Sequence, residues 1–198
     1  MKIFVFLILL FLSACAQWQE IFKEKISFET MNKNITKEIK IVEKEETLGE
    51  AFTPIIDRGK NRMGNIRLAS SAISGRKLLP GEEFSFNKVV GAHSRNRGYK
   101  DAPVIFKGEK SYGVGGGVCQ VSTTIYMAAV NANLQITQRH IHSEEVAYAP
   151  NHTDATVVYG EKDMKFKNNT DDTLYIYTWV SDNKVFSKII KKGIDIQQ

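Results

Sequence analysis

Several residue types that mark particular protein classes are scarce in this chain. Its 198 residues include two cysteines, four prolines and 14 glycines, so we expect neither a disulfide framework nor a collagen-like or low-complexity chain. No apolar run reaches the about 20 residues that a membrane-spanning helix needs. Lys and Arg number 27 against 22 Asp and Glu, and they form no stripe, which argues against a nucleic-acid partner.

The longest apolar run lies at the N-terminus, over residues 3–12 after Lys2. It has the length of the apolar core of a secretory signal. Leu12-Ser13-Ala14-Cys15 resembles the cleavage box of bacterial lipoproteins, which implies cleavage before Cys15 and a lipid on its thiol. We expect a signal peptide over 1–14 and an exported chain, lipid-anchored to a bacterial membrane and facing the cell wall or periplasm. An ordinary secretory signal with an incidental cysteine is the alternative.

The mature chain has room for one main domain and a short extra segment. Residues 15–46 are rich in charge and contain no Pro or Gly. Within them Ile26 and Phe28 alternate with polar neighbours, as do Ile39 and Ile41, which predicts a tether with weak edge strands. We place the main domain at 47–190 and a C-terminal tail at 191–198. No internal repeat is visible.

The pattern of the main domain predicts an α+β fold, a mostly antiparallel sheet packed on a central helix. Apolar residues at helical spacing from Val118 to Ala132 predict that helix, which begins at Cys119. A smaller helix is predicted near 65–74 and a flexible loop over 113–117. Short apolar or alternating segments predict the strands, at 84–86, 102–106, 146–148, 155–159, 174–180 and 185–190, with a hairpin turn over 181–184.

Cys119 follows the glycine run Gly115-Gly116-Gly117 and opens the central helix. A helix N-terminus carries partial positive charge and free N–H groups, which stabilise a thiolate. Glycines let the backbone approach a substrate closely and aim amides at an oxyanion. Histidines and an acidic residue follow later in the chain, as a thiolate–imidazole pair oriented by a carboxylate requires. A buried, inert Cys119 with glycines that serve only tight packing explains the same pattern.

Several dense motifs are spread along nearly the whole mature chain, from about Thr47 to Ile190. They are Pro80–Asn87, Arg97–Tyr99, Ala102–Ile105, Gly115–Thr124, Arg139–Ser143, Asp154–Val157 and Phe166–Thr170. Together these motifs resemble the VanW family. That family takes its name from an accessory gene of vancomycin resistance clusters, acts at the bacterial cell wall and has been linked to L,D-transpeptidation of peptidoglycan.

The resemblance implies the roles of single residues. Cys119 is the nucleophile, His142 its base and Asp154 the acid that orients the base. His140 lies in the same motif, and we expect one histidine to face Cys119, with His142 favoured and His140 the alternative. Amides near Gly117–Gln120 are expected to hold the oxyanion.

Further polar residues join the predicted site. Gln120 and Ser122 are candidates for polar substrate contacts, and Arg97 and Arg139 for binding carboxylates of the peptide stem. His93 is interpreted as a loop histidine. The family tends to have Pro-x-Gly-x-Asp before the acid, whereas this chain has Pro150-Asn151-His152-Thr153-Asp154, which puts the position of Asp154 in doubt.

The expected function is thus acyl transfer between peptidoglycan stem peptides through a cysteine thioester, without a cofactor or metal. Three alternatives stay open. The protein is a non-catalytic accessory or wall-binding lipoprotein, or a cysteine peptidase or carboxypeptidase on wall peptides. The third is a zinc site from Cys119, His140, His142 and His152, which Cys and His suit chemically but which no Cys-x-x-Cys or His-x-x-x-His spacing supports.

Overall fold

The computed structural model describes residues 20–30, 40–106 and 109–197, and Cys15 with the proposed signal peptide lies outside them. The chain divides into two compact units. The first consists of residues 1–44 and 194–198. In it, residues 20–30 form a helix whose side chains are all exposed, so the strand predicted from the alternation of Ile26 and Phe28 is wrong. An alternation over so few residues also fits the exposed surface of a helix.

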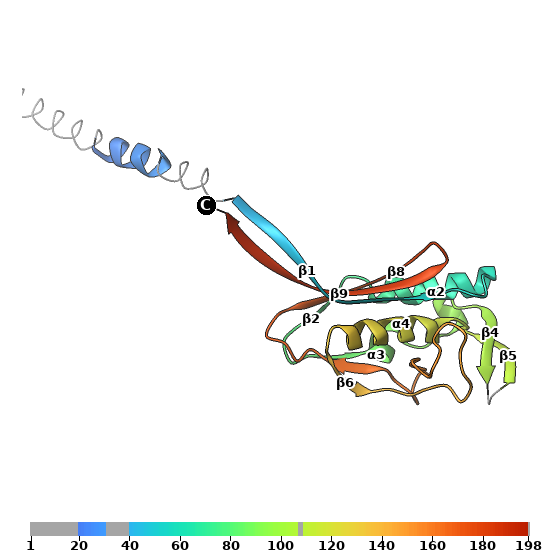
Figure 1. Ribbon diagram of the computed structural model, residues 1–198. Coiled ribbons are helices and arrows are strands. Elements are labelled where there is room, and N and C mark those ends of the chain that lie inside the picture. Colours follow the sequence, from blue (N-terminus) through green and yellow to red (C-terminus); the bar gives the residue numbers. More distant parts are fainter. Residues whose placement is uncertain (1–19, 31–39, 107–108, 198) are drawn as a thin grey trace, which may run out of the picture. The chain divides into compact units, whose positions relative to one another are not determined.

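The second unit, residues 45–193, has the α+β fold that the sequence predicts. A four-stranded sheet has the order β1-β9-β8-β2 and a three-stranded sheet the order β3-β7-β6. Helices α2 and α4 lie between these two sheets (Figure 1), where α2 contacts β8 and α4 contacts β6. A separate hairpin of β4 and β5 lies at one end of the helices (Figure 1).

The helices are α2 (Lys60–Ile73), α3 (Phe86–Val90) and α4 (Val118–Asn131), with a 3₁₀ turn at Arg95–Arg97. The strands are β1 (Lys40–Pro54), β2 (Arg76–Leu78), β3 (Glu83–Ser85), β4 (Asp101–Phe106), β5 (Glu109–Val114), β6 (Gln135–Gln138), β7 (Lys165–Lys167), β8 (Leu174–Ser181) and β9 (Lys184–Gln197). The ladders β2–β8, β8–β9, β3–β7, β6–β7 and β4–β5 are all antiparallel.

Helix α4 forms the centre of the core. Its residues Val121, Ile125 and Ala128 are fully buried, in keeping with their helical spacing, and it begins at Val118, one residue before the predicted start at Cys119. The Phe84 and Phe166 rings stack beside it at 4.9 Å between centroids. The last two strands also pair as predicted, through a turn in which Asp182 and Asn183 both have positive φ, as tight hairpins require.

Several predicted elements differ from those observed. Helix α2 begins at Lys60 rather than near residue 65 and is as long as α4, with 14 residues each. The strand predicted over 84–86 ends at Ser85, because the Ser85 hydroxyl accepts a hydrogen bond from the Lys88 N–H (3.1 Å) and caps helix α3. Gly113 and Val114 belong to β5 and not to a loop.

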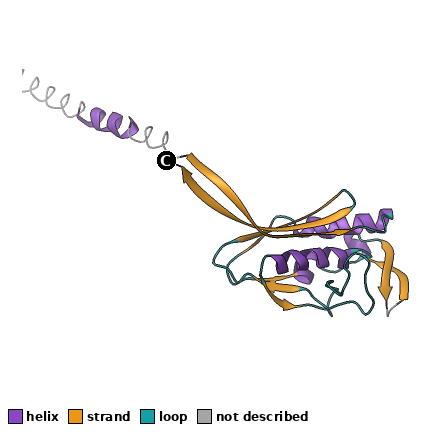
Figure 2. Cartoon of the chain, in the orientation of Figure 1, coloured by secondary structure: helices purple, strands orange, loops and turns teal. Residues whose placement is uncertain are grey.

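The segment between β6 and β7 is irregular (Figure 2). The strands predicted at 146–148 and 155–159 are reduced there to two isolated bridges, Val146 with Ala149 and Val158 with Lys162. Ala155 and Val157 are nevertheless buried, so their apolar character reflects packing against the core rather than a ladder. No helix within the described ranges has the length and apolar content needed to cross a bilayer.

Candidate functional site

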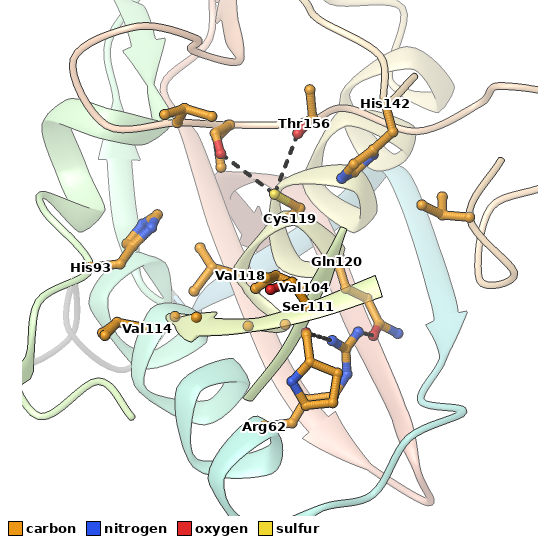
Figure 3. A pocket seen from close by; sticks show the side chains of 18 of the residues that line it. Arg62, His93, Val104, Ser111, Val114, Val118, Cys119, Gln120, His142 and Thr156 are labelled. Carbon is orange, nitrogen blue, oxygen red and sulfur yellow. Dashed lines mark hydrogen bonds between the residues drawn. The ribbon is translucent and has the colours of Figure 1, made fainter. Parts of the chain in front are cut away.

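Cys119 lies at the base of a pocket of about 1020 Å³ at the N-terminal end of helix α4. The pocket is lined by residues of α2, the β4–β5 hairpin, the glycine turn and the irregular segment before β7. Cys119 is half-buried. Its sulfur lies 3.5 Å from the Thr156 hydroxyl and 3.5 Å from the Val157 carbonyl oxygen (Figure 3).

His142 points toward Cys119 across this pocket (Figure 3). Its Nδ1 lies 2.6 Å from Asp154 Oδ2, and the backbone N–H of His142 donates to the same oxygen at 2.9 Å. The His142 side chain is 12% exposed and that of Asp154 is 1% exposed. The structure therefore brings together the cysteine, the histidine and the acid that the sequence selects, in the order thiol, imidazole, carboxylate.

The order of these groups is reflected in the pKa values. Burial alone raises the pKa of the Cys119 thiol, but the facing imidazole of His142, followed by the Thr156 hydroxyl and the Val157 backbone, lowers it below the usual value of a thiol. Burial likewise depresses the pKa of His142, and Cys119 and Asp154 together raise it above its usual value. Both shifts favour a thiolate beside an imidazolium, the reactive form of a cysteine nucleophile.

Hydrogen bonds between residues 139–142 and residues 154–156 position His142 beside Asp154. The Thr156 N–H donates to the His140 carbonyl (2.7 Å), and Arg139 Nε donates to the Asp154 carbonyl (2.8 Å). The Thr123 hydroxyl of α4 accepts from the Ala155 N–H (3.0 Å), which fixes the acidic segment against the helix. These are backbone positions far apart in sequence, so sequence spacing alone does not reveal them.

His140 lies outside the pocket, and its Nε2 is 3.0 Å from Gln138 Nε2. Both histidines are in irregular chain after β6, so strand alternation, which would place residues two apart on the same face, does not govern them. His152 is exposed. The zinc alternative gains no support from this arrangement, because no group of three or more His, Cys, Asp or Glu side chains in the described part of the chain could hold a metal ion.

The loop before Asp154 contains His152 at the position where a glycine was expected. His152, at the glycine position, has φ of 52°, and Asn151 has φ of 58°. The left-handed conformation strains a residue with a side chain, although Asn and His tolerate it better than most. Arg139 ties this loop down by donating to the His152 carbonyl. Asp154 therefore contacts His142, and the backbone strain lies at Asn151 and His152, which precede it.

The glycine run packs against protein. A Cβ at Gly116 would lie 2.6 Å from the Pro103 carbonyl oxygen, and one at Gly117, where φ is 105°, would lie 2.8 Å from Ile66 Cγ1. The buried Asn65 side chain donates to the Gly116 carbonyl (3.0 Å). The glycines thus allow α4 to begin directly against α2 and β4, which sets the position of Cys119.

The backbone also narrows the choice of oxyanion donors. Within the range Gly117–Gln120, the Val118 N–H already donates to the Gly115 carbonyl (3.1 Å) and the Gln120 N–H to the Gly117 carbonyl (3.1 Å). No described residue accepts from the Gly117 N–H or the Cys119 N–H. These two amides, of which that of Cys119 belongs to the first helical turn, are therefore the available donors.

Two polar residues of α4 that were predicted to contact substrate form hydrogen bonds within the protein, and one of them, Gln120, also lines the pocket. The Gln120 side chain is buried and donates to the Thr53 hydroxyl (3.1 Å) and the Pro54 carbonyl (2.8 Å). Ser122 is fully buried outside the pocket and donates to the Cys119 and Ala155 carbonyls. Both residues connect α4 to neighbouring chain, so they hold the site together.

Arg62, His93 and Tyr148 are among the pocket residues that the sequence did not assign to the site. Burial, followed by the nearby charge of Arg97, lowers the pKa of His93 to about 4, so its ring is neutral at pH 7. Arg139, predicted to bind a stem carboxylate, instead contacts backbone carbonyls and stacks on the Tyr126 ring (4.5 Å). In the sequence, no local pattern distinguishes Arg62 from the other arginines of the chain, which would all be expected on the surface.

The fold and the pocket define an α+β domain in which a cysteine at a helix start faces a histidine held by a buried acid. The family profile described as "VanW like protein" matches residues 61–190, and the chain belongs to the VanW family. A Bacillus subtilis relative, YoaR, itself described as uncharacterized, is 47% identical over 131 residues, which are 66% of this chain and 43% of that protein.

A second relative is the vancomycin B-type resistance protein VanW of Enterococcus faecalis, 31% identical over 135 residues, 66% of this chain and 49% of that protein. The chain thus covers about half the length of these two relatives. No solved structure matches the chain. The family match confirms the resemblance to VanW proteins.

Proposed function

We propose that this protein is a cysteine-dependent acyltransferase that acts on peptidoglycan stem peptides, of the L,D-transpeptidase type. The observation that carries the proposal is the line from Cys119 to His142 to Asp154, with the His142–Asp154 contact at 2.6 Å. The pocket above Cys119 is large enough for a peptide. The resistance-related relative adds support for a role at the cell wall.

In the first half-reaction the Cys119 thiolate attacks the carbonyl carbon between the diamino acid and the terminal D-Ala of a stem. The Cys119 N–H stabilises the oxyanion. The imidazolium of His142 gives its proton to the departing D-Ala amine as the C–N bond breaks, which leaves a thioester on Cys119. Asp154 keeps the proton on Nδ1 and stabilises the charged ring.

In the second half-reaction a side-chain amine of another stem attacks the thioester carbonyl. His142, now neutral, takes the proton from that amine, a new amide forms, and the thiolate leaves. Water in the place of the amine gives hydrolysis by the same steps and makes the protein a carboxypeptidase.

The test is incubation of the purified protein with muropeptides, read by mass spectrometry. Wild type should form a cross-linked dimer with loss of one D-Ala, Cys119→Ala should form none, and Cys15→Ser is the matched control that keeps activity. A shortened stem without cross-links identifies a hydrolase. If wild type converts no stem, the catalytic proposal is wrong and a binding role is favoured.

We also propose that Cys15 carries a lipid that anchors the exported chain to a bacterial membrane, facing the cell wall or periplasm. The support is the sequence Leu12-Ser13-Ala14-Cys15 after the apolar run. Acyl chains contribute about 0.8 kcal/mol per buried methylene, so two or more hold a protein stably. Cys15→Ser should move the protein out of the membrane fraction in cells, and unchanged membrane association contradicts the proposal.

A further inference from the structure

Arg62 places an unpaired positive charge in the pocket that contains Cys119 (Figure 3). It is the third residue of α2 and is half-buried. Its Nη2 donates to Gln120 Oε1 (3.1 Å) and its Nη1 to the Pro103 carbonyl (3.4 Å). No Asp or Glu in the described ranges forms an ion pair with it, and its buried Nε has no acceptor there.

The carboxylates that line the same pocket are committed elsewhere. Asp57 is exposed and accepts from the Gly59 N–H (2.9 Å), and Glu145 is exposed and accepts from the Asn151 N–H (2.7 Å). Both neutral partners of Arg62 leave its charge uncompensated. A guanidinium withdrawn from water without a counter-ion is costly, and a carboxylate is its best complement because two parallel N–H groups match two oxygens.

The guanidinium is also held in a fixed orientation. Its partner Gln120 cannot turn freely, because the amide nitrogen of Gln120 donates to the Thr53 hydroxyl (3.1 Å) and the Pro54 carbonyl (2.8 Å). The Oε1 atom of Gln120 therefore remains directed at Arg62. A side chain so held loses little conformational entropy when it binds a ligand.

The positions of Arg62 and Cys119 suit a single bound peptide. Both line the pocket together with Tyr148. Burial raises the pKa of the Tyr148 phenol, Cys119 raises it further, and Arg62 lowers it, so both charges act on one phenol. A substrate whose reacting carbonyl lies at Cys119 therefore occupies a pocket that Arg62 also lines.

We infer that Arg62 binds a carboxylate of the peptide substrate and so selects stems with a free acid near the reacting bond. The inference rests on the proposed function. Two groups of a stem have this chemistry, the C-terminal carboxylate of the departing D-Ala and the side-chain carboxylate of a diaminodicarboxylic acid.

The experiment uses three synthetic stems: the free acid, its C-terminal amide, and the amide of the side-chain carboxylate. Binding of each stem to Cys119→Ala protein is measured by calorimetry, and turnover of each by wild type is measured by mass spectrometry. One of the two amides should bind about 10- to 100-fold more weakly than the free acid, as expected for a charge-assisted hydrogen-bonded pair. The weaker amide identifies which carboxylate Arg62 binds.

Arg62→Gln, made in the Cys119→Ala protein, should lose this discrimination and bind all three stems about equally. In the active protein it should raise KM far more than it lowers kcat. Arg67→Gln is the matched control, because it removes an exposed positive charge from the same helix and should keep the discrimination.

Equal binding of the three stems by the Arg62-containing protein overturns the inference, as does discrimination that survives Arg62→Gln. The comparison on the Arg62-containing protein decides the matter even if Arg62→Gln does not fold. Tight, selective binding without turnover by wild type contradicts the proposed function but not the role of Arg62. Failure of all three stems to bind contradicts both.

Discussion

Replacement of His142 by alanine should convert Cys119 from a reactive thiolate into a poorly reactive buried thiol. In the wild-type site burial is the largest single influence on the Cys119 pKa and raises it, and His142 supplies the leading opposing contributions. Without the imidazole only the Thr156 hydroxyl and the Val157 backbone still lower the pKa. The pKa of Cys119 should therefore rise.

The size of the effect follows from the thiolate fraction. A thiol of pKa about 8.5 is only about 0.3% ionised at pH 6, whereas a thiolate paired with an imidazolium is ionised to a far larger extent at that pH. Each unit of pKa changes this fraction about tenfold. Alkylation of Cys119 at pH 6 should therefore slow at least about tenfold in His142→Ala, and its pH midpoint should move upward.

The assay is alkylation by iodoacetamide from pH 5 to pH 10, followed by intact-mass spectrometry. A Cys15→Ser background leaves Cys119 as the single thiol of the chain, and the denatured chain supplies the ordinary thiol reference. His140→Ala is the matched control, since His140 contacts Gln138 outside the pocket. Its profile should coincide with that of the parent protein.

Stability must be measured in parallel, because Asp154 is buried and loses its ring partner in His142→Ala. The His142 backbone N–H still donates to it, so the cost should be about 1–3 kcal/mol and the fold should persist. Superimposable alkylation profiles of His142→Ala and its parent would refute the thiolate–imidazole pair. A loss of reactivity in His140→Ala instead would show that the wrong histidine has been assigned.

Three further changes test other parts of the site. Asp154→Asn should keep the His142 ring in place, because the amide oxygen can accept hydrogen bonds from the same two N–H groups. It should lower turnover about 10- to 100-fold, because the negative charge is lost. Asp154→Ala should lower turnover further, and equal turnover of the two variants would contradict this role of Asp154. His152→Gly should raise the free energy of unfolding by about 1 kcal/mol, since it removes the strain of a side chain at a left-handed backbone position. Asn151→Gly should raise it by less, because Asn tolerates that conformation better. Chemical denaturation measures both free energies. Gly117→Ala should destabilise by more than about 2 kcal/mol, because a side chain there combines a positive φ with a 2.8 Å contact to Ile66; a denaturation midpoint equal to that of wild type would show that the start of α4 is not tightly packed.

The sequence predicts the elements whose stability is local. The apolar period of α4 and the glycine before it set the start of the helix within one residue, and the Asp182-Asn183 turn indicates the hairpin of β8 and β9. The dense motifs are also sufficient to recognise the VanW family from the sequence. Cys119, His142 and Asp154 could be named in advance because these motifs were recognisable, not because their spacing in the chain encodes a distance.

Only the tertiary structure decides which groups meet. Arg62 lies in the first turn of α2, and the residues of that turn show no clear apolar period. It lines the pocket because the hydrogen bond between Asn65 and Gly116 holds α2 beside the start of α4. Residues 155–157 resemble a strand in sequence. In the structure, hydrogen bonds between the Ala155 backbone and the side chains of Ser122 and Thr123 hold this segment against α4. Local sequence specifies backbone period and caps, whereas the contacts between segments depend on long-range packing that no single stretch of sequence contains.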